Sequence, residues 1–372
     1  MTKRKNICIT INSLASGGAE KQSLLLAKAL KPHHDVIFVI LKPQPIYQPR
    51  FEVLKEEAIE HIFLPKNPVK KGIAFTRLLK RRKIDIIFSF LPTDTILSAI
   101  CGKMAGVPHI FGGIRNSYIP KIKYSLIKII HNYLLSYTIA NNYAAYSSSI
   151  GFGFKKKVFV IPNGIEIKPF FARQGLDRKT ITIISLGRLV KQKDYETALK
   201  GISELKKTLK TDIKLKYRIV GHGPEKETIT SHIKQYDLQE EVEIISNPPN
   251  IYGLLESSDI YLSTSIFEGF SNSIMEAMNC GLPVVATDAG DNSRLVIHNK
   301  NGFITELADY KKIGEHLRYL IDSQEERHQM GLESYNHLVQ SFSYSVFQKK
   351  YLNIIKNIEN IQIEEGEYIV QK

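Results

Sequence analysis

Two glutamates, Glu268 and Glu276, bracket a short glycine-containing loop in the sequence Glu-Gly-Phe-Ser-Asn-Ser-Ile-Met-Glu. The apolar run 260–264 before them predicts a buried strand, and Gly281 predicts the end of a helix that begins near Ser271. Glu268 then precedes the helix, and Glu276 lies more than one turn into it. In that arrangement one carboxylate can face a sugar while the other accepts hydrogen bonds from ribose hydroxyls.

The start of this helix is a second element that could bind a ligand. Ser271 is a suitable N-cap residue, and the first backbone N–H groups of a helix have no partner within it. Those groups and the positive end of the helix dipole suit a diphosphate. The residues expected to bind a ligand in this segment are Gly269, Phe270, Ser271, Asn272 and Glu276, with Glu268 as the catalytic candidate.

Two series of alternating strands and helices must position this loop. The first series is predicted at 6–11, 19–30, 36–41, 51–57, 59–64, 75–82 and 84–90. In the second series, helices separate most of the strands, which are predicted at 180–186, 215–220, 242–245, 260–264 and 283–287. Such alternation is typical of parallel sheets, so the expected fold class is α/β with two Rossmann-like domains and a ligand-binding cleft beyond the carboxyl ends of their strands.

The turn-rich junction Ile161-Pro-Asn-Gly164 is the expected linker between the domains. It divides the chain into an N-terminal domain at 1–165, a C-terminal domain at 166–345, and a C-terminal helix and tail at 346–372. A helical pattern from about 343 to 358 could pack on either domain, and the sequence leaves that choice open.

The Glu-x7-Glu loop closely resembles that of retaining nucleotide-sugar glycosyltransferases with the GT-B fold, specifically glycosyltransferase family 4. Two further blocks carry the same resemblance. The sequence Gly-Arg-Leu-Val-Lys-Gln-Lys resembles the family's Gly-Arg-x4-Lys element, which implies that Arg188 and Lys193 bind the donor diphosphate. The sequence Gly-Gly-Ala-Glu-Lys resembles the glycine-rich first loop, in which Gly17 and Gly18 let a helix N-terminus approach the phosphates and the acceptor.

A further turn supports the resemblance with less force. In Arg-Ile-Val-Gly-His-Gly-Pro-Glu, Gly221 lies in a turn that the family places near the nucleobase. Lys226 stands where a dinucleotide fingerprint has its third glycine, which argues against a nicotinamide site. His222 in this turn is interpreted as an exposed loop histidine rather than a catalytic one.

The sequence departs from the family's pattern in two places. Many members carry a sugar-contacting histidine after a strand of the N-terminal half, whereas here Arg115 and Asn116 occupy the corresponding loop. We expect Arg115 and Asn116 to lie near the sugar or the acceptor, with His109, at or inside the preceding strand, as the alternative. A glutamate that often follows the Asp-x-Gly turn is missing from Asp291-Asn-Ser-Arg294, which points to a different donor sugar or acceptor.

Positive charge is concentrated in the first half of the chain. Residues 1–165 contain 25 lysines and arginines against 8 acidic residues, while residues 166–372 contain 26 against 29. An anionic partner of the first half is therefore expected. No stacking platform or recognition motif indicates nucleic acid. The segments 80–83, 118–130 and 155–157 suit an anionic membrane surface, although 118–130 is equally compatible with an ordinary amphipathic core helix.

The cysteines and the hydropathy pattern indicate the compartment. Cys8, Cys101 and Cys280 are far apart in the sequence and predict neither a disulfide framework nor a zinc site. The first apolar stretch is too short for a signal peptide, and no later one reaches about 18 residues. The expectation is a cytoplasmic protein that is peripheral on the inner face of the membrane.

The resemblance implies a reaction. A hexose or N-acetylhexosamine would pass with retention of configuration from a UDP-sugar, the commonest donor in the family, to a polyprenyl-diphosphate-linked or other glycolipid acceptor in bacterial polysaccharide assembly. No Asp-x-Asp triplet occurs, so neither a metal nor a cofactor besides the nucleotide sugar is expected. Arg188, Lys193 and the helix N–H groups would stabilise the leaving diphosphate. The alternatives are a nucleotide-sugar epimerase, another GT-B enzyme such as a phosphorylase, or a transferase with a soluble acceptor.

Overall fold

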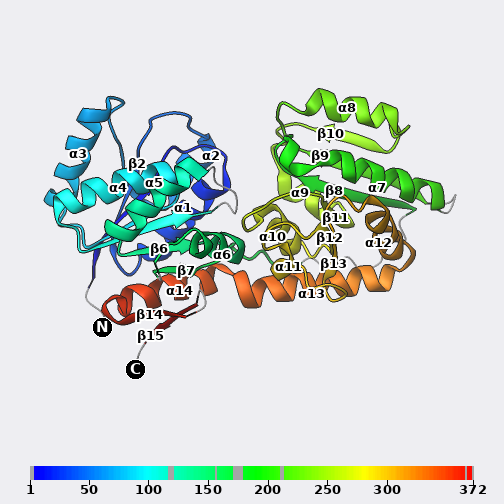
Figure 1. The fold of residues 1–372 in the computed structure, drawn as a ribbon. Coiled ribbons are helices and arrows are strands. Elements are labelled where there is room, and N and C mark those ends of the chain that lie inside the picture. Colours follow the sequence, from blue (N-terminus) through cyan, green and yellow to red (C-terminus); the bar gives the residue numbers. More distant parts are fainter. Residues whose placement is uncertain are drawn as a thin grey trace. The chain divides into compact units, whose positions relative to one another are not determined.

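The computed structural model describes residues 4–115, 121–155, 157–170, 179–209, 213–364 and 367–370. The chain forms two α/β units (Figure 1). The first unit combines residues 1–165 with residues 344–372, and the second contains residues 166–343. In each unit a parallel sheet carries helices on its faces, as the alternating sequence pattern predicts.

The first unit is built on a seven-stranded parallel sheet of order β3-β2-β1-β4-β5-β6-β7. Its strands are β1 (Asn6–Ile11), β2 (Asp35–Ile40), β3 (Glu60–Phe63), β4 (Ile86–Ser89), β5 (His109–Ile114), β6 (Tyr137–Ala140) and β7 (Val158–Val160). Side chains of β1 alternate between the two faces. Ile7, Ile9 and Ile11 belong to one core, and Cys8 belongs to the other.

The helices of the first unit pack on these two cores and on a third cluster, which contains Ala145 of α6 and Tyr124 of α5. They are α1 (Gly18–Leu30), α2 (Gln48–Glu56), α3 (Pro68–Arg81), α4 (Pro92–Ala105), α5 (Lys121–Tyr133), α6 (Tyr143–Gly151) and α14 (Tyr344–Lys356). Side chains of α1, α2 and α14 pack on the core that contains Ile9. Side chains of α3, α4 and α5 pack together on the opposite face, in the core that contains Cys8.

The second unit is built on a six-stranded parallel sheet of order β10-β9-β8-β11-β12-β13. Its strands are β8 (Thr180–Leu186), β9 (Lys214–Val220), β10 (Val242–Ile245), β11 (Ile260–Ser263), β12 (Val284–Thr287) and β13 (Gly302–Thr305). Its α-helices are α7 (Tyr195–Thr208), α8 (Lys226–Gln235), α9 (Ile251–Glu256), α10 (Asn272–Asn279), α11 (Asn292–Leu295), α12 (Tyr310–Asp322) and α13 (Gln324–Phe342).

The strand order of this second sheet decides which loops are neighbours. Strands β9, β8, β11 and β12 are adjacent and parallel, so their carboxyl ends lie along one edge. The segments that follow them contain Gly221, Arg188, Glu268 and Gly290, respectively. Residues up to about 100 positions apart in the sequence are therefore delivered to one edge of one sheet.

The predicted elements match the structure best where β-branched runs are buried. Strands at 6–11, 180–186 and 242–245 occur at the predicted residues. The helix predicted at 75–82 instead begins at Pro68, because Asn67 caps it by accepting from the N–H groups of Val69 and Lys70. Its first turn carries no buried apolar side chain and so shows no helical pattern in the sequence.

The C-terminal helix α14 packs on the first unit. Phe347, Tyr351, Ile354 and Ile355 are buried in the core that also contains Ile9. The remaining tail forms a short antiparallel pair, β14 (Ile361–Glu364) with β15 (Glu367–Val370). The first unit is thus completed by residues that follow the second unit in the sequence.

The Pro-Asn-Gly junction lies at the boundary between the units, yet it is anchored in the first. The amide side chain of Gln22 in α1 donates to the Gly164 carbonyl at 2.9 Å and accepts from the Gly164 N–H at 3.0 Å. A Cβ atom at Gly164 would lie 2.6 Å from the Cβ of Phe347. Glycine is required there by close packing with α14, so this turn is not a freely moving hinge.

His131 at the end of α5 gives the first unit a pH-dependent stability. Its ring is fully buried between the Thr138 hydroxyl, the Lys155 carbonyl and the ring of Phe154. Burial lowers the pKa of His131 from 6.5 to about 4. The unfolded chain therefore takes up the proton first as the pH falls, and the contribution of neutral His131 is complete above pH 6.5 and lost towards pH 4.

We expect urea unfolding between pH 7.5 and 4.5 to show this loss. Replacing His131→Asn should flatten the pH dependence of the free energy of unfolding by up to about 3 kcal/mol. The matched variant His222→Asn, at an exposed histidine, should keep the wild-type profile. Identical profiles for wild type and His131→Asn would contradict the assignment.

Candidate active site

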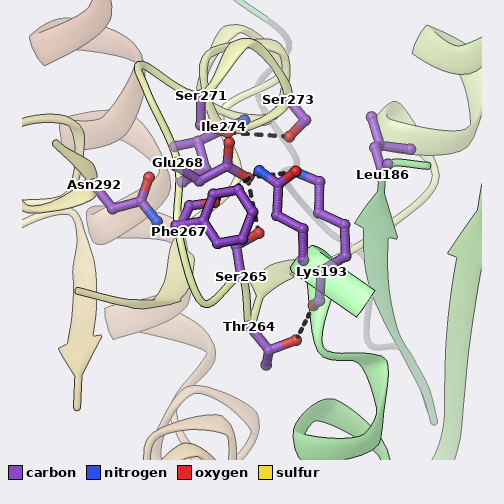
Figure 2. A network of polar contacts seen from close by, with 12 residues as sticks. Leu186, Lys193, Thr264, Ser265, Phe267, Glu268, Ser271, Ser273, Ile274 and Asn292 are labelled. Carbon is purple, nitrogen blue, oxygen red and sulfur yellow. Dashed lines mark hydrogen bonds and ion pairs between the residues drawn. The ribbon is translucent and has the colours of Figure 1, made fainter. Parts of the chain in front are cut away.

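The side chains of Lys193 and Glu268 meet at the carboxyl edge of the second sheet (Figure 2). Lys193 follows β8 and Glu268 follows β11, the strand next to it. The Lys193 ammonium donates to Oε1 of Glu268, and the two side chains are only 17% and 11% exposed. The structure therefore brings together two residues that the sequence singled out in separate motifs.

The loop that carries Glu268 is tied to the loop that carries Lys193 by several further hydrogen bonds. The Ser265 hydroxyl donates to the same Glu268 oxygen at 2.8 Å. The Thr264 hydroxyl bonds the carbonyl oxygen of Lys193 at 3.0 Å. Gln192 accepts from the N–H of Ile266 at 2.9 Å and donates to the Phe267 carbonyl at 2.7 Å. Both ends of the ion pair are thus held by neighbours, which reduces the motion lost when a ligand binds.

A glycine allows a third loop to pack against the Glu268 loop. Gly290, after β12, has a φ of 63°, and a Cβ there would lie 2.3 Å from the Glu268 carbonyl oxygen. The N–H of Asp291 bonds the Gly269 carbonyl at 3.3 Å. Only glycine combines this backbone conformation with this approach. The loop 288–292 therefore supports the turn at Glu268 and Gly269 from the side of β12.

Helix α10 begins where the sequence predicted. The Ser271 side chain accepts from the N–H of Ile274 at 3.4 Å and caps the helix. Asn272 is the first helical residue and is half-buried. Phe270 points into the core, where its ring lies 5.0 Å from that of Phe342, so its side chain fixes the loop. Gly269 remains half-buried between Glu268 and the cap.

Glu276 lies in the second turn of α10 and is half-buried. The buried phenol of Tyr261, in β11, is close enough to be affected by both glutamates. Burial raises the pKa of Tyr261, and the negative charges of Glu276 and Glu268 raise it further. Both members of the Glu-x7-Glu pair therefore lie around the same end of β11.

The Gly221 turn braces the segment that contains Arg188. A Cβ at Gly221 would lie 1.8 Å from the Gly187 carbonyl oxygen, and the Leu189 N–H donates to the His222 carbonyl at 2.9 Å. The side chains of Arg188 and His222 are exposed. Within the described part of the chain, the Arg188 guanidinium makes no hydrogen bond or ion pair, while the Arg188 carbonyl accepts from the N–H of Val190 at 3.0 Å, so the guanidinium can turn to a ligand.

In the first unit, Gly17 and Gly18 stand at the N-terminus of α1, beyond the carboxyl end of β1. Both are exposed, and Gly17 occupies the N-cap position without a side chain to cap the helix. A Cβ at Gly17 would lie 2.4 Å from Oε2 of Glu20. Gly17 thus provides no side-chain cap for the first N–H groups of α1, and the end of the Glu20 side chain lies where a side chain at Gly17 would begin.

Arg115 directly follows β5 at the same edge of the first sheet. Its guanidinium donates to Oδ1 of Asn163 at 2.9 Å and lies 4.5 Å above the ring of Phe90. Burial lowers the pKa of Arg115 to about 10, while Asp94 and Glu20 favour its charged form. Arg115 therefore stays charged at neutral pH and is held in one orientation.

The two alternatives weighed for the sugar-contacting position lie at opposite ends of β5. His109 is the first residue of the strand, and its ring bonds Glu359 at 3.1 Å. Arg115 follows the last residue, at the carboxyl end, where ligands of such sheets bind. The geometry favours Arg115 over His109. Asn116 lies outside the described residues.

Several residues of the site were not predicted from sequence. Ser265, Thr264 and Gln192 hold the loops, and Asn163 orients Arg115. Gln192 and Asn163 stand inside motifs that were recognised, but at positions read only as spacer or turn. Thr264 is the last residue of a predicted strand and Ser265 follows it, and hydroxyl residues there are the one available signal.

The site can bind an anion and a polyol at adjacent positions. Arg188, Lys193 and the N-terminus of α10 supply positive charge and N–H donors. Glu268 and Glu276 supply acceptors for hydroxyl groups. Among the described residues, no group of three or more histidine, cysteine, aspartate or glutamate side chains could hold a metal ion.

Two family models match the chain in succession. Residues 16–168 match the model described as Glycosyltransferase Family 4, and residues 166–337 match the model described as Glycosyl transferases group 1. Together they cover residues 16–337, which is most of both units.

Curated relatives are bacterial glycosyltransferases. One, from Campylobacter jejuni, is an N-acetylgalactosamine-N,N'-diacetylbacillosaminyl-diphospho-undecaprenol 4-alpha-N-acetylgalactosaminyltransferase, 24% identical over 86% of this chain and 91% of its own length. Another, from Escherichia coli, is a UDP-Gal:alpha-D-GlcNAc-diphosphoundecaprenol alpha-1,3-galactosyltransferase, 25% identical over 65% of this chain and 67% of its own length.

Solved structures agree on the fold. Anabaena HepE in complex with UDP-glucose superposes with a TM-score of 0.81 at 18% identity, over 95% of this chain and 99% of its own. A likeness at this identity shows the fold alone. The predicted GT-B architecture of two Rossmann-like domains is confirmed.

The two sheets give the GT-B fold, and the comparisons give the family. The chain belongs to glycosyltransferase family 4. It is a glycosyltransferase, as the sequence motifs predicted.

We expect the two cations of the site to be essential for transfer. Replacing Lys193→Ala or Arg188→Ala should lower kcat/KM by about a hundredfold or more, because each removes positive charge from a developing anion in a partly buried site. Lys191→Ala is the matched control, since Lys191 is exposed in the same 3-10 turn as Lys193 and should tolerate the change. Unchanged donor affinity and turnover in both site variants would contradict this assignment.

Proposed function

We propose that the protein transfers a hexose or N-acetylhexosamine from a UDP-sugar to a polyprenyl-diphosphate-linked saccharide, with retention at the anomeric carbon, in the assembly of a bacterial surface polysaccharide. The Lys193–Glu268 pair beside the N-terminus of α10 is the observation that carries this proposal. The pair joins an ammonium, which suits a diphosphate, to a carboxylate, which suits sugar hydroxyls, by one hydrogen bond. The acceptor class is supported by the relatives from C. jejuni and E. coli, whose names specify undecaprenyl-diphosphate-linked acceptors.

In the proposed reaction, Lys193 exchanges part of its bond to Glu268 for an oxygen of the donor diphosphate. Arg188 and the N–H groups of α10 share the negative charge that develops there. The bond between the anomeric carbon and the UDP oxygen breaks, and the acceptor oxygen bonds that carbon on the same face. The acceptor's proton passes to the departing phosphate oxygen, while Glu268 orients the sugar. UDP is supported by the donor in the name of the E. coli relative.

Neither a metal nor another cofactor is required in this proposal, since the protein itself supplies the cations. A nucleotide-sugar epimerase, another GT-B enzyme or a transferase with a soluble acceptor remain the alternatives. They differ in product: an epimerase would change the donor without any acceptor.

A transfer assay with UDP-, GDP- and ADP-sugars and a polyprenyl-diphosphate-linked acceptor tests the reaction. We expect a UDP-sugar to be used, and to raise Tm in a thermal-shift screen because it binds only the folded state. EDTA should leave the rate unchanged within about twofold. NMR of the product should show the anomeric configuration of the donor. Inversion, or conversion of the donor without acceptor, would overturn the proposal.

We also propose that the first unit docks on an anionic membrane through the outer sides of α3, α4 and α5, here called the α3–α4–α5 face. The three helices contact one another in the order α3, α4, α5 (Figure 1). Their inner sides share one core, so their outer sides form one continuous layer. Among the described residues, no helix is both long and apolar enough to cross a bilayer.

The α3–α4–α5 face combines exposed apolar side chains with positive charge. Its exposed apolar residues are Val69, Ile73, Ile100, Met104, Leu126, Ile129 and Tyr133. Its exposed basic residues include Lys70, Arg77, Lys80, Arg81 and Lys103. The sequences of α3 and α5 contain no acidic residue, and the one in α4, Asp94, is buried. Apolar insertion and attraction to anionic lipid therefore act on the same surface.

Cosedimentation with liposomes tests this docking. The wild type should bind phosphatidylglycerol-rich vesicles at low salt and lose binding as the salt rises. The triple variant Met104→Ser, Ile129→Ser, Tyr133→Ser should bind about tenfold more weakly or worse. The matched control Tyr319→Ser, Leu332→Ser removes exposed apolar side chains from the second unit and should bind as the wild type. No binding at low salt, or equal binding by the triple variant, would contradict the proposed docking through the α3–α4–α5 face.

A further inference from the structure

The glycine-rich loop before α1 is held by a residue that no motif contains. Arg50, in the first turn of α2, donates from its two terminal nitrogens to successive carbonyl oxygens of this loop. One acceptor is Ala15, and the other is Ser16 at 2.9 Å. We infer that Arg50 is a positioning residue, which fixes the peptide planes of the loop so that its N–H groups face a substrate.

Arg50 is itself fixed from two sides. Its guanidinium lies 3.9 Å from Oε2 of Glu20 in α1, and the two side chains are 13% and 10% exposed. Its chain segment is attached to the same loop through the N–H of Tyr47, which donates to the Leu14 carbonyl at 2.7 Å. A parallel bridge between Leu14 and Ile46 precedes this bond. The backbone segment that carries the Arg50 guanidinium is therefore held in place.

Peptide planarity turns this contact into an orientation. In a trans peptide the C=O and N–H groups point in opposite directions. The Ala15 carbonyl points at Arg50, so the N–H of Ser16 points away from α2. The same holds for the Ser16 carbonyl and the N–H of Gly17. These two N–H groups join those at the N-terminus of α1 in a surface that suits an anion.

The loop needs such a clamp because of its composition. Gly17 and Gly18 allow close approach, but glycine has the largest conformational freedom in the unbound chain. A planar guanidinium can hold two carbonyls at once, whereas an ammonium lacks that fixed geometry. Gly17 lies next to the clamp, since a Cβ there would lie 2.4 Å from the Glu20 oxygen that pairs with Arg50.

The kinetic consequence rests on the proposed function, because it assumes that the loop contacts a phosphate-bearing substrate. Without the clamp, the loop must be ordered at the moment of binding. Loss of Arg50 is therefore expected to raise KM for that substrate more than it lowers kcat. A residue that merely stabilised the fold would lower Tm and the amount of active enzyme, and would leave KM unchanged.

The mobility of the loop can be measured without any substrate. In protein labelled with 15N-glycine, we expect order parameters of the Gly17 and Gly18 amides near about 0.8 in the wild type and below about 0.6 in Arg50→Ala. Arg50→Lys should resemble Arg50→Ala. Arg82→Lys is the matched control, because Arg82 pairs with Glu60 on the surface of the same unit.

In the transfer assay, Arg50→Lys should raise KM about tenfold to a hundredfold with Tm unchanged. Gly17 and Gly18 amides as ordered in Arg50→Ala as in the wild type would overturn the inference, whatever the activity. An unchanged KM in a variant with a mobile loop would overturn the link to the substrate. A wild type without transferase activity, but with the expected change in mobility, would contradict the proposed function and leave the clamp in place.

Discussion

The ion pair between Lys193 and Glu268 depends on the adjacency of β8 and β11, and the rest of the second unit's site depends on that pair. Two charges that are mostly removed from water cost free energy unless their geometry is good and their remaining hydrogen-bond capacity is used. Ser265 supplies a second bond to the carboxylate, and Gln192 ties the two loops together through backbone groups. Gly290 lets the next loop close against the turn. The strand order thus brings the two residues together, and the surrounding polar contacts offset the free-energy cost of removing their charges from water.

The first unit holds the groups at the carboxyl edge of its sheet in a different way. Its carboxyl edge carries a glycine loop and a buried guanidinium rather than an ion pair across loops. Side chains there hold backbone or a single cation: Gln22 holds both polar groups of Gly164, and Asn163 holds Arg115. The amide side chain is suited to this task, because it donates and accepts in one plane without adding charge. Each unit therefore presents a preorganised edge, one with paired charges and one with oriented backbone.

The sequence predicts the strands and the main candidate residues of the site, but it does not predict the contacts between the loops. Buried β-branched runs gave the strands, the loop between the two glutamates gave Glu268, and the resemblance of the Gly-Arg-x4-Lys element to that of the family gave Arg188 and Lys193. It could not give the contacts between loops, because strand order decides which loops meet. Gln192 is ordinary in sequence and acquires its role only from the neighbouring β11 loop. Arg50 is equally inconspicuous, since its partners are carbonyls, which every residue has.

The geometry of the first unit also bears on how the proposed membrane docking could be combined with the proposed lipid-linked acceptor. In strand-helix-strand units the helices run opposite to the strands, so each begins near the carboxyl edge of the sheet. Val69 at the start of α3 therefore lies near that edge, and Met104 at the end of α4 lies near the other. The exposed apolar side chains follow the full length of the helices and do not cover the edge that carries Gly17 and Arg115. A bilayer lying on the α3–α4–α5 face would leave this edge open at its margin. That margin is where a lipid anchored in the bilayer would present its diphosphate.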